Sequence, residues 1–127
     1  MSKYILVMVG GAFGAVSRFI VATFVLKFYS AEFPLGTFLI NVTGSFGIGV
    51  LMMLFLNRPA INPNWRLLAV TGFLGGYTTF STFEWETLTT LKGGAGLVGL
   101  LNVLLSVGLG LVGVWVGAAL ANRFWPR

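Results

Sequence analysis

The chain has 127 residues, of which 57% are apolar and only 9% are charged, and its net charge is +5. Soluble domains carry about 25% charged residues, and disordered chains are poor in apolar residues, so the composition excludes both classes. The sequence contains no His and no Cys, and its only carboxylates are Glu32, Glu84 and Glu86. This residue set excludes cysteine nucleophiles, disulfides and most transition-metal sites, and it argues against an enzyme.

Four apolar stretches are each long enough to cross a bilayer as a helix, which takes about 20 residues. They run from about 4 to 26, 34 to 56, 67 to 91 and 95 to 121. Charge within them is limited to Arg18 in the first stretch and to Glu84 and Glu86 in the third. The sequence therefore predicts an all-α integral membrane protein, with a single membrane domain over residues 1–127.

The first stretch contains Arg18 and is too long for a cleaved signal peptide. The three connections between the stretches are short, and the second contains Asn62-Pro63, which is typical of a helix N-cap followed by proline at the first helical position.

The eight basic residues occur singly, and all but Arg18 lie near the ends of the predicted spans, which argues against a nucleic-acid-binding surface. Five of them flank one membrane face and two flank the other. The first group is Lys3, Arg58, Arg66, Arg123 and Arg127, and the second is Lys27 and Lys92. Because positive charge favours the cytoplasmic face, this bias predicts that both termini lie in the cytoplasm.

Eighteen glycines are present, and most of them lie inside the apolar stretches. Helices in a bilayer associate by close packing, which small residues permit. The glycines therefore predict tight helix contacts within one subunit. They also favour an oligomer, because four thin helices alone can hardly enclose a pathway.

Polar side chains recur at four-residue spacing in two of the stretches. Thr37, Asn41 and Ser45 share one face of the second predicted helix, and Asn102 and Ser106 share one face of the fourth. Hydrogen bonding between helices accounts equally well for any single residue of this group. Two separate polar stripes nevertheless favour a wet path through the membrane.

The third stretch contains a sequence that is unsuited to a continuous helix. Gly75-Gly76 is followed by four β-branched or aromatic residues, and Ser81-x-x-Glu84 matches a capping box. We predict a helix that stops near Gly75 and restarts near Phe80, and the alternative is an intact helix whose glycines serve packing. The exposed carbonyl and N–H groups of a broken helix can bind a cation and an anion respectively.

Two phenylalanines follow this predicted break. Phe80 and Phe83 are three residues apart and therefore share a helix face. Because the edge of an aromatic ring is positive, rings turned edge-on into a narrow pore can meet a small anion weakly enough for its release.

At these residues the sequence resembles the Fluc/CrcB family of fluoride channels, and the resemblance covers all four stretches in order. The matching segments are Gly10-Gly11-x-x-Gly14-Ala15-x-x-Arg18-Phe19, Gly36-Thr37-x-x-x-Asn41-x-x-Gly44-Ser45-Phe46-x-x-Gly49, Gly72-x-x-Gly75-Gly76-Tyr77-Thr78-Thr79-Phe80-Ser81-Thr82-Phe83 and Asn102-x-x-x-Ser106.

The resemblance implies four transmembrane helices with a broken third helix, assembled as an antiparallel homodimer that inserts in both orientations. It implies two anion pores per dimer in the inner membrane of a bacterium. It further implies passive, selective export of fluoride, which lowers fluoride toxicity, and a structural sodium ion at the dimer centre that is not transported.

The resemblance also assigns roles to individual residues. Phe80 and Phe83 become the pore phenylalanines, Asn41 the pore amide donor, and Arg18 a positive charge that draws anions to the entrance. Further pore-lining assignments fall on Thr82, Ser106 and Glu86. Backbone carbonyls of Gly75 and Thr78 from both subunits become the sodium ligands.

The sequence departs from this pattern in two respects. The five-to-two charge bias is larger than insertion in both orientations suggests, and Glu84 places an acid where small polar residues are common. One alternative is a small dimeric exporter of cationic compounds, but such a protein needs a buried carboxylate early in the chain, and the first two stretches contain none. The other is a membrane scaffold without transport, which the broken third span and the polar stripes argue against.

Overall fold

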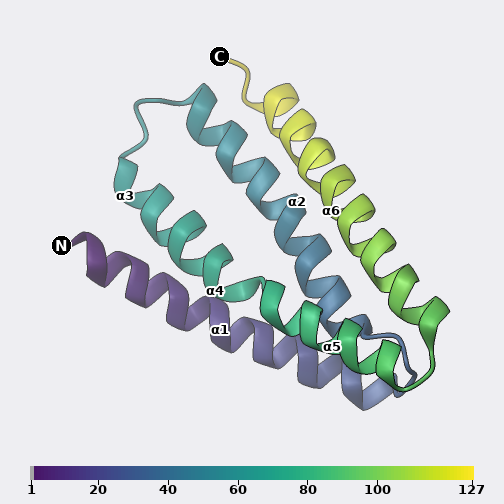
Figure 1. Ribbon diagram of the computed structural model, residues 1–127. Coiled ribbons are helices and arrows are strands. Elements are labelled where there is room, and N and C mark those ends of the chain that lie inside the picture. Colours follow the sequence, from purple (N-terminus) through teal and green to yellow (C-terminus); the bar gives the residue numbers. More distant parts are fainter. Residues whose placement is uncertain (1) are drawn as a thin grey trace.

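The computed structural model describes residues 2–127, and every regular element in this range is a helix, as the sequence predicts (Figure 1). Within residues 2–127, six α-helices and one π-helix follow one another. They are α1 (Lys3–Phe28), α2 (Leu35–Asn57), α3 (Pro63–Arg66), the π-helix η1 (Leu67–Leu74), α4 (Gly75–Tyr77), α5 (Phe80–Lys92) and α6 (Gly96–Phe124).

Three of these helices are long and apolar enough to cross a membrane. They are α1, α2 and α6, with 26, 23 and 29 residues, and they coincide with the first, second and fourth predicted stretches. The third predicted stretch is divided among η1, α4 and α5. No sequence pattern predicts the π-helical hydrogen bonding in η1.

The helices pack in two seams. In one seam α2 lies along α6, and in the other α1 lies along η1 and α4 (Figure 1). A Cβ atom at Gly117 of α6 would overlap the carbonyl oxygen of Phe46, and one at Gly14 of α1 would overlap the carbonyl oxygen of Phe73. The prediction that glycines bring these helices into close contact is therefore confirmed.

The connections also follow local sequence signals. The Asn62 side chain accepts a hydrogen bond of 2.9 Å from the N–H of Asn64, with Pro63 at the first helical position of α3, as predicted. A second asparagine, Asn57, is buried at the end of α2 and donates to the Asn122 side chain at 2.9 Å and to the Trp125 carbonyl at 2.8 Å. These bonds fix the C-terminus against the end of α2.

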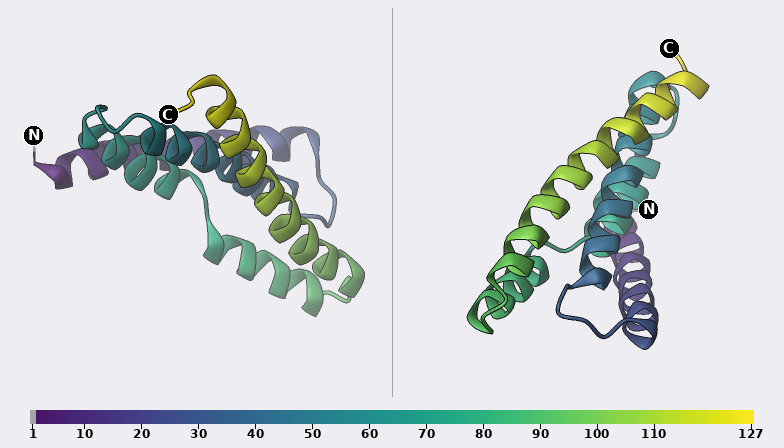
Figure 2. Two further views of the ribbon diagram at one scale, coloured as in Figure 1. Left: turned by 90° about the horizontal axis from the view of Figure 1, so that it is seen from above. Right: turned by 90° about the vertical axis from the view of Figure 1, so that its right-hand side faces the viewer.

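The molecule is open on one side. Helix α5 and the beginning of α6 lie side by side and diverge from α1 and from the first turns of α2 (Figure 2). The turns after α1 and α5 lie at one end of the molecule, and the C-terminus and the connection after α2 lie at the other (Figure 1). This divergence leaves a cavity beside the C-terminal end of α4 and the N-terminal end of α5.

Candidate functional site

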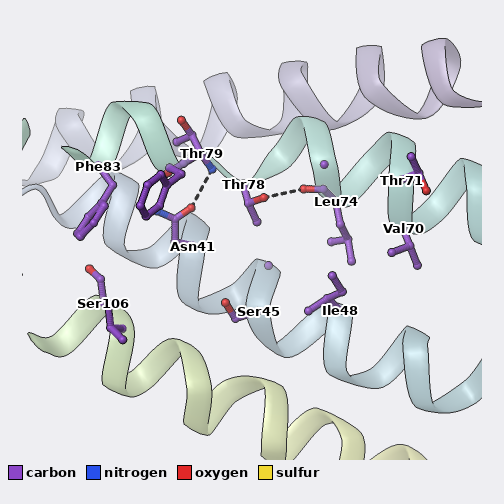
Figure 3. Close-up of a pocket in the computed structure, with 14 residues that line it drawn as sticks. Asn41, Ser45, Ile48, Val70, Thr71, Leu74, Thr78, Thr79, Phe83 and Ser106 are labelled. Carbon is purple, nitrogen blue, oxygen red and sulfur yellow. Dashed lines mark hydrogen bonds between the residues drawn. The ribbon is translucent and has the colours of Figure 1, made fainter. Parts of the chain in front are cut away.

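The site is centred on two extended residues between α4 and α5. Thr78 has φ −75° and ψ 158°, and Thr79 has φ −149° and ψ 119°, so neither residue is helical. Both are β-branched, which favours extended backbone. The Thr78 hydroxyl donates to the Leu74 carbonyl at 2.9 Å and so closes the end of α4 (Figure 3).

Asn41 of α2 holds this segment through both the nitrogen and the oxygen of its side-chain amide. Its Nδ2 donates to the Thr79 carbonyl at 2.9 Å. Its Oδ1 accepts from the Thr79 N–H at 2.9 Å (Figure 3). In a continuous helix the Thr79 N–H would donate to the Gly75 carbonyl, four residues earlier. The side chain of Asn41 therefore satisfies the backbone of Thr79 and leaves the Gly75 carbonyl without that partner.

Two details of the predicted helix ends are wrong. Helix α4 includes both Gly75 and Gly76, so the predicted stop near Gly75 lies two residues early. Gly76 packs directly on Gly11 of α1, where a Cβ would crowd the Gly11 carbonyl oxygen, so this glycine serves helix packing within α4 and does not end the helix.

The predicted capping box at Ser81 is also wrong, because the N-cap of α5 is Thr79. Its hydroxyl accepts from the Thr82 N–H at 3.3 Å and lies 2.9 Å from the Thr82 hydroxyl. An N-cap needs extended backbone, and Thr79 has it while Ser81 is already within the helix. The sequence signal for this cap is Thr79 itself, a residue type that is favoured at N-caps, three residues before the N–H of Thr82 that it accepts from.

A cavity of about 410 Å³ opens beside the extended residues. It is bounded by α2, the η1–α4 segment, α5 and α6 (Figure 3). Six of the nine predicted site residues line it: Asn41, Gly75, Thr78, Phe80, Phe83 and Ser106. Asn41 and Ser45 from the polar stripe of α2 and Ser106 from that of α6 line the same cavity, whereas Thr37 and Asn102 are buried and do not line it.

The other three predicted site residues do not line the cavity. Arg18 is half-buried on α1, Thr82 is exposed on α5, and none of Arg18, Thr82 and Glu86 lines the cavity. The Oε2 atom of Glu86 is buried without a hydrogen-bond partner among residues 2–127. Glu84, the acid that departs from the family pattern, is exposed.

Sequence reasoning missed part of the lining. Thr79 is a buried lining residue, and Val70 and Leu74 of η1 form an apolar wall opposite Ile48 of α2. No sequence signal marks these apolar residues, because periodicity alone does not tell a cavity wall from a packed core.

The two phenylalanines sit at the α5 side of the cavity. Their ring centroids are 5.8 Å apart with the rings inclined at 39°. Phe83 is 8% exposed, whereas Phe80 is 71% exposed, so only Phe83 is enclosed by the subunit itself. Both residues line the cavity, as their shared helix face predicts.

The polar groups that line the cavity are uncharged amides and hydroxyls. None of its lining residues is a Lys, Arg, Asp or Glu. The N-terminus of the 13-residue helix α5, with its positive dipole end, starts at the cavity, and α4 ends there with its carbonyls. Amide, hydroxyl and main-chain groups can therefore bind a small ion without the strong attraction of a full charge.

A multi-pass helical membrane protein with such a cavity belongs to the class that moves small ions or solutes. The model of the family described as CrcB-like protein, Camphor Resistance (CrcB), matches residues 5–118. The chain therefore belongs to the CrcB family, as its resemblance indicates.

Curated relatives match the chain over nearly its whole length. The fluoride-specific ion channel FluC of Solibacter usitatus is 49% identical over 121 residues, which is 95% of this chain and 99% of the relative. Proteins of the same name from Acidobacterium capsulatum and a Sulfurihydrogenibium species are 43% and 39% identical, over 95% and 96% of this chain and 97% and 98% of their own lengths. All three are named as ion channels and none as an enzyme.

Replacing Asn41 by Leu removes both hydrogen bonds to Thr79 at nearly constant volume. We expect the free energy of unfolding to fall by about 1–3 kcal/mol, the cost of leaving buried polar groups unpaired. We also expect the Thr79 amide to exchange faster with deuterium. Ser45→Ala, one turn further along α2 on the same cavity, is the matched control. Unchanged exchange at Thr79 in Asn41→Leu would contradict the role given to this side chain.

Proposed function

We propose that the protein is a fluoride-selective channel through which fluoride leaves the cytoplasm passively, and that it thereby lowers fluoride toxicity. The observation that carries the proposal is an uncharged, hydrogen-bonding cavity at the Thr78–Thr79 segment in a chain of the CrcB family. The names of the relatives, fluoride-specific ion channels, supply the identity of the ion.

Fluoride is small and strongly hydrated, so a pathway must replace its water with hydrogen-bond donors. Asn41 uses one N–H of its side-chain amide on Thr79, and its second N–H remains for an anion. The first N–H groups of α5 and the ring edges of Phe80 and Phe83 add positive potential without charge. Binding of this kind is weak enough for release, and a narrow path excludes the larger chloride.

The alternative, a small exporter of cationic compounds, is less well supported. Such an exporter needs a carboxylate in its binding cavity to balance the charge of its substrate. The lining of this cavity contains none, and neither α1 nor α2 contains a carboxylate.

The proposal includes an antiparallel homodimer with a broken third membrane helix in each subunit. The single chain exposes 8165 Å², whereas a compact protein of its mass exposes about 6,600 Å². The exposed residues include lining groups such as Gly75 and Phe80. A second copy that covers the open side would enclose the pathway, and an antiparallel arrangement would give two equivalent pathways.

We also propose a structural sodium ion that the channel does not transport. Its ligands would be the backbone carbonyls of Gly75 and Thr78 from both subunits, and carbonyl oxygens suit such a hard cation. The bond between Asn41 and the Thr79 N–H supports this assignment, because it leaves the Gly75 carbonyl without its helical donor. When bound, the ion would supply positive charge at the dimer centre and hold the two subunits together.

Liposomes loaded with fluoride or with chloride test the channel directly. We expect the purified protein to release fluoride rapidly and to retain chloride. Equal leakage of both ions, or release of neither, would contradict the proposed function.

Two protein variants, measured in the same assay, test whether the phenylalanine rings contact the ion. Phe80→Ile and Phe83→Ile keep apolar bulk but lose the ring edge. We take an edge contact with an anion to be of the same order as an edge contact between two aromatic rings, about 0.5–1.5 kcal/mol. Fluoride release should therefore slow by roughly two- to tenfold, while the oligomer stays intact on size exclusion. Normal release by both variants would show that ring edges do not contact the ion.

Orientation can be measured by labelling, because the chain has no native cysteine. We expect Ser30→Cys, in the exposed connection after α1, to react with an impermeant maleimide in about half of the chains in intact cells. Ala60→Cys, at the opposite end of the molecule, is the matched control and should also react in about half. Labelling that is complete at one position and absent at the other would show a single orientation.

The sodium proposal predicts a cation dependence. Replacing sodium on both sides of the liposome by N-methylglucamine should slow fluoride release and weaken the dimer, because this cation is too large for a carbonyl cage. Potassium serves as the control for ionic strength. A rate of release and a dimer fraction that do not depend on the cation would exclude a structural role for sodium.

A further inference from the structure

A chain of hydrogen bonds connects α5 to the Ser106 wall of the cavity. The Thr87 hydroxyl donates to the Phe83 carbonyl at 2.8 Å, and the Asn102 Nδ2 donates to the Thr87 hydroxyl at 2.8 Å. The Ser106 hydroxyl donates to the Asn102 Oδ1 at 3.2 Å. Asn102 is 1% exposed and Thr87 is 8% exposed, so water does not substitute for these bonds.

In this arrangement one bond sets the direction of the others, because the Thr87 hydroxyl donates to the Phe83 carbonyl. A carbonyl only accepts, so the Thr87 hydroxyl donates its single proton to the Phe83 carbonyl. It can then only accept a hydrogen bond from Asn102. Asn102 therefore turns its N–H group toward Thr87 and its carbonyl toward Ser106. Ser106 must then donate its own proton to Asn102.

This direction is unfavourable for an anion at the cavity wall. Ser106 lines the cavity and lies on α6 opposite Asn41 and Phe83 (Figure 3). With its proton directed at Asn102, the Ser106 hydroxyl offers the cavity only oxygen lone pairs, which repel an anion.

A half-turn of the Asn102 amide reverses the chain of bonds. Thr87 then donates to the Asn102 carbonyl, Asn102 donates its N–H to Ser106, and the Ser106 proton becomes free for the cavity. The rearrangement loses only the hydroxyl bond to Phe83, whose carbonyl keeps its helical partner, the Thr87 N–H. The two orientations therefore have nearly the same number of hydrogen bonds.

We propose that Asn102 is a positioning residue that determines whether Ser106 can donate a hydrogen bond to the transported anion. The proposal rests on the proposed function, since it concerns fluoride in this cavity. An arriving fluoride favours the reversed orientation because it accepts the released Ser106 proton, and its departure restores the original bonds.

We call the hydrogen bonds that connect Phe83, Thr87, Asn102 and Ser106 the relay. Thr87→Val tests the relay by removing one hydroxyl at nearly constant volume. Without that hydroxyl, one end of the Asn102 amide is left unpaired in either orientation, and a buried unpaired N–H is rarer than an unpaired carbonyl. The variant therefore favours the orientation in which Asn102 donates to Ser106. We expect the fluoride concentration for half-maximal release from liposomes to fall by roughly two- to tenfold, the range of one net hydrogen bond.

The effect must depend on Ser106, which separates a relay from a merely structural role. In the Ser106→Ala background, Thr87→Val should leave the half-maximal concentration unchanged. Thr90→Val is the matched control, because the Thr90 hydroxyl makes the same kind of bond, 2.8 Å to the Glu86 carbonyl on α5, whereas Asn102 bonds to Thr87 and Ser106. It should leave the half-maximal concentration at the wild-type value.

The outcomes distinguish this proposal from the proposed function. A wild-type protein that releases no fluoride overturns the proposed function and the relay with it. A wild-type protein that releases fluoride, combined with an equal effect of Thr87→Val in both backgrounds or with no effect in either, overturns the relay alone. A shift that disappears in Ser106→Ala supports it.

Discussion

The arrangement of this protein depends on the need to pair every backbone polar group inside a membrane. An unpaired N–H or carbonyl in hydrocarbon costs several kcal/mol, so a chain can leave the helical conformation there only where other groups take over its hydrogen bonds. Asn41 does this for both backbone groups of Thr79. One side chain thus permits the extended segment, and the segment in turn directs α5 away from α1 and opens the cavity.

Close helix packing makes this interaction geometrically feasible. Asn41 reaches Thr79 because α2 lies close to the segment, and Gly44 permits that approach, since a Cβ there would overlap the Thr78 side chain. On the other side, Gly76 lets α4 lie against Gly11 of α1. The hydrogen bonds of Asn41 therefore depend on the glycines, because these small residues set the helix separation at which the Asn41 side chain reaches Thr79.

Much of this was predictable from local sequence. The three long helices, the Asn62 cap and the shared face of Phe80 and Phe83 follow from hydropathy, capping preference and helical periodicity. The end of α4 and the cap of α5 were misplaced because propensity describes an isolated helix, whereas in the folded chain Gly76 packs against α1 within α4 and Asn41 fixes the backbone at Thr79. Arg18, Thr82 and Glu86 lie outside the cavity of the single chain.

The sequence by itself determined that the chain is a helical membrane protein, which residues are polar within it and which family it belongs to, because composition, periodicity and motifs are properties of the linear chain. The tertiary structure alone decided which of those polar groups meet. Asn41 and Thr79 are 38 residues apart, and Asn102 and Thr87 lie on different helices. Whether a hydroxyl or amide faces an ion or a neighbour depends on packing angles and hydrogen-bond direction, which no local pattern encodes.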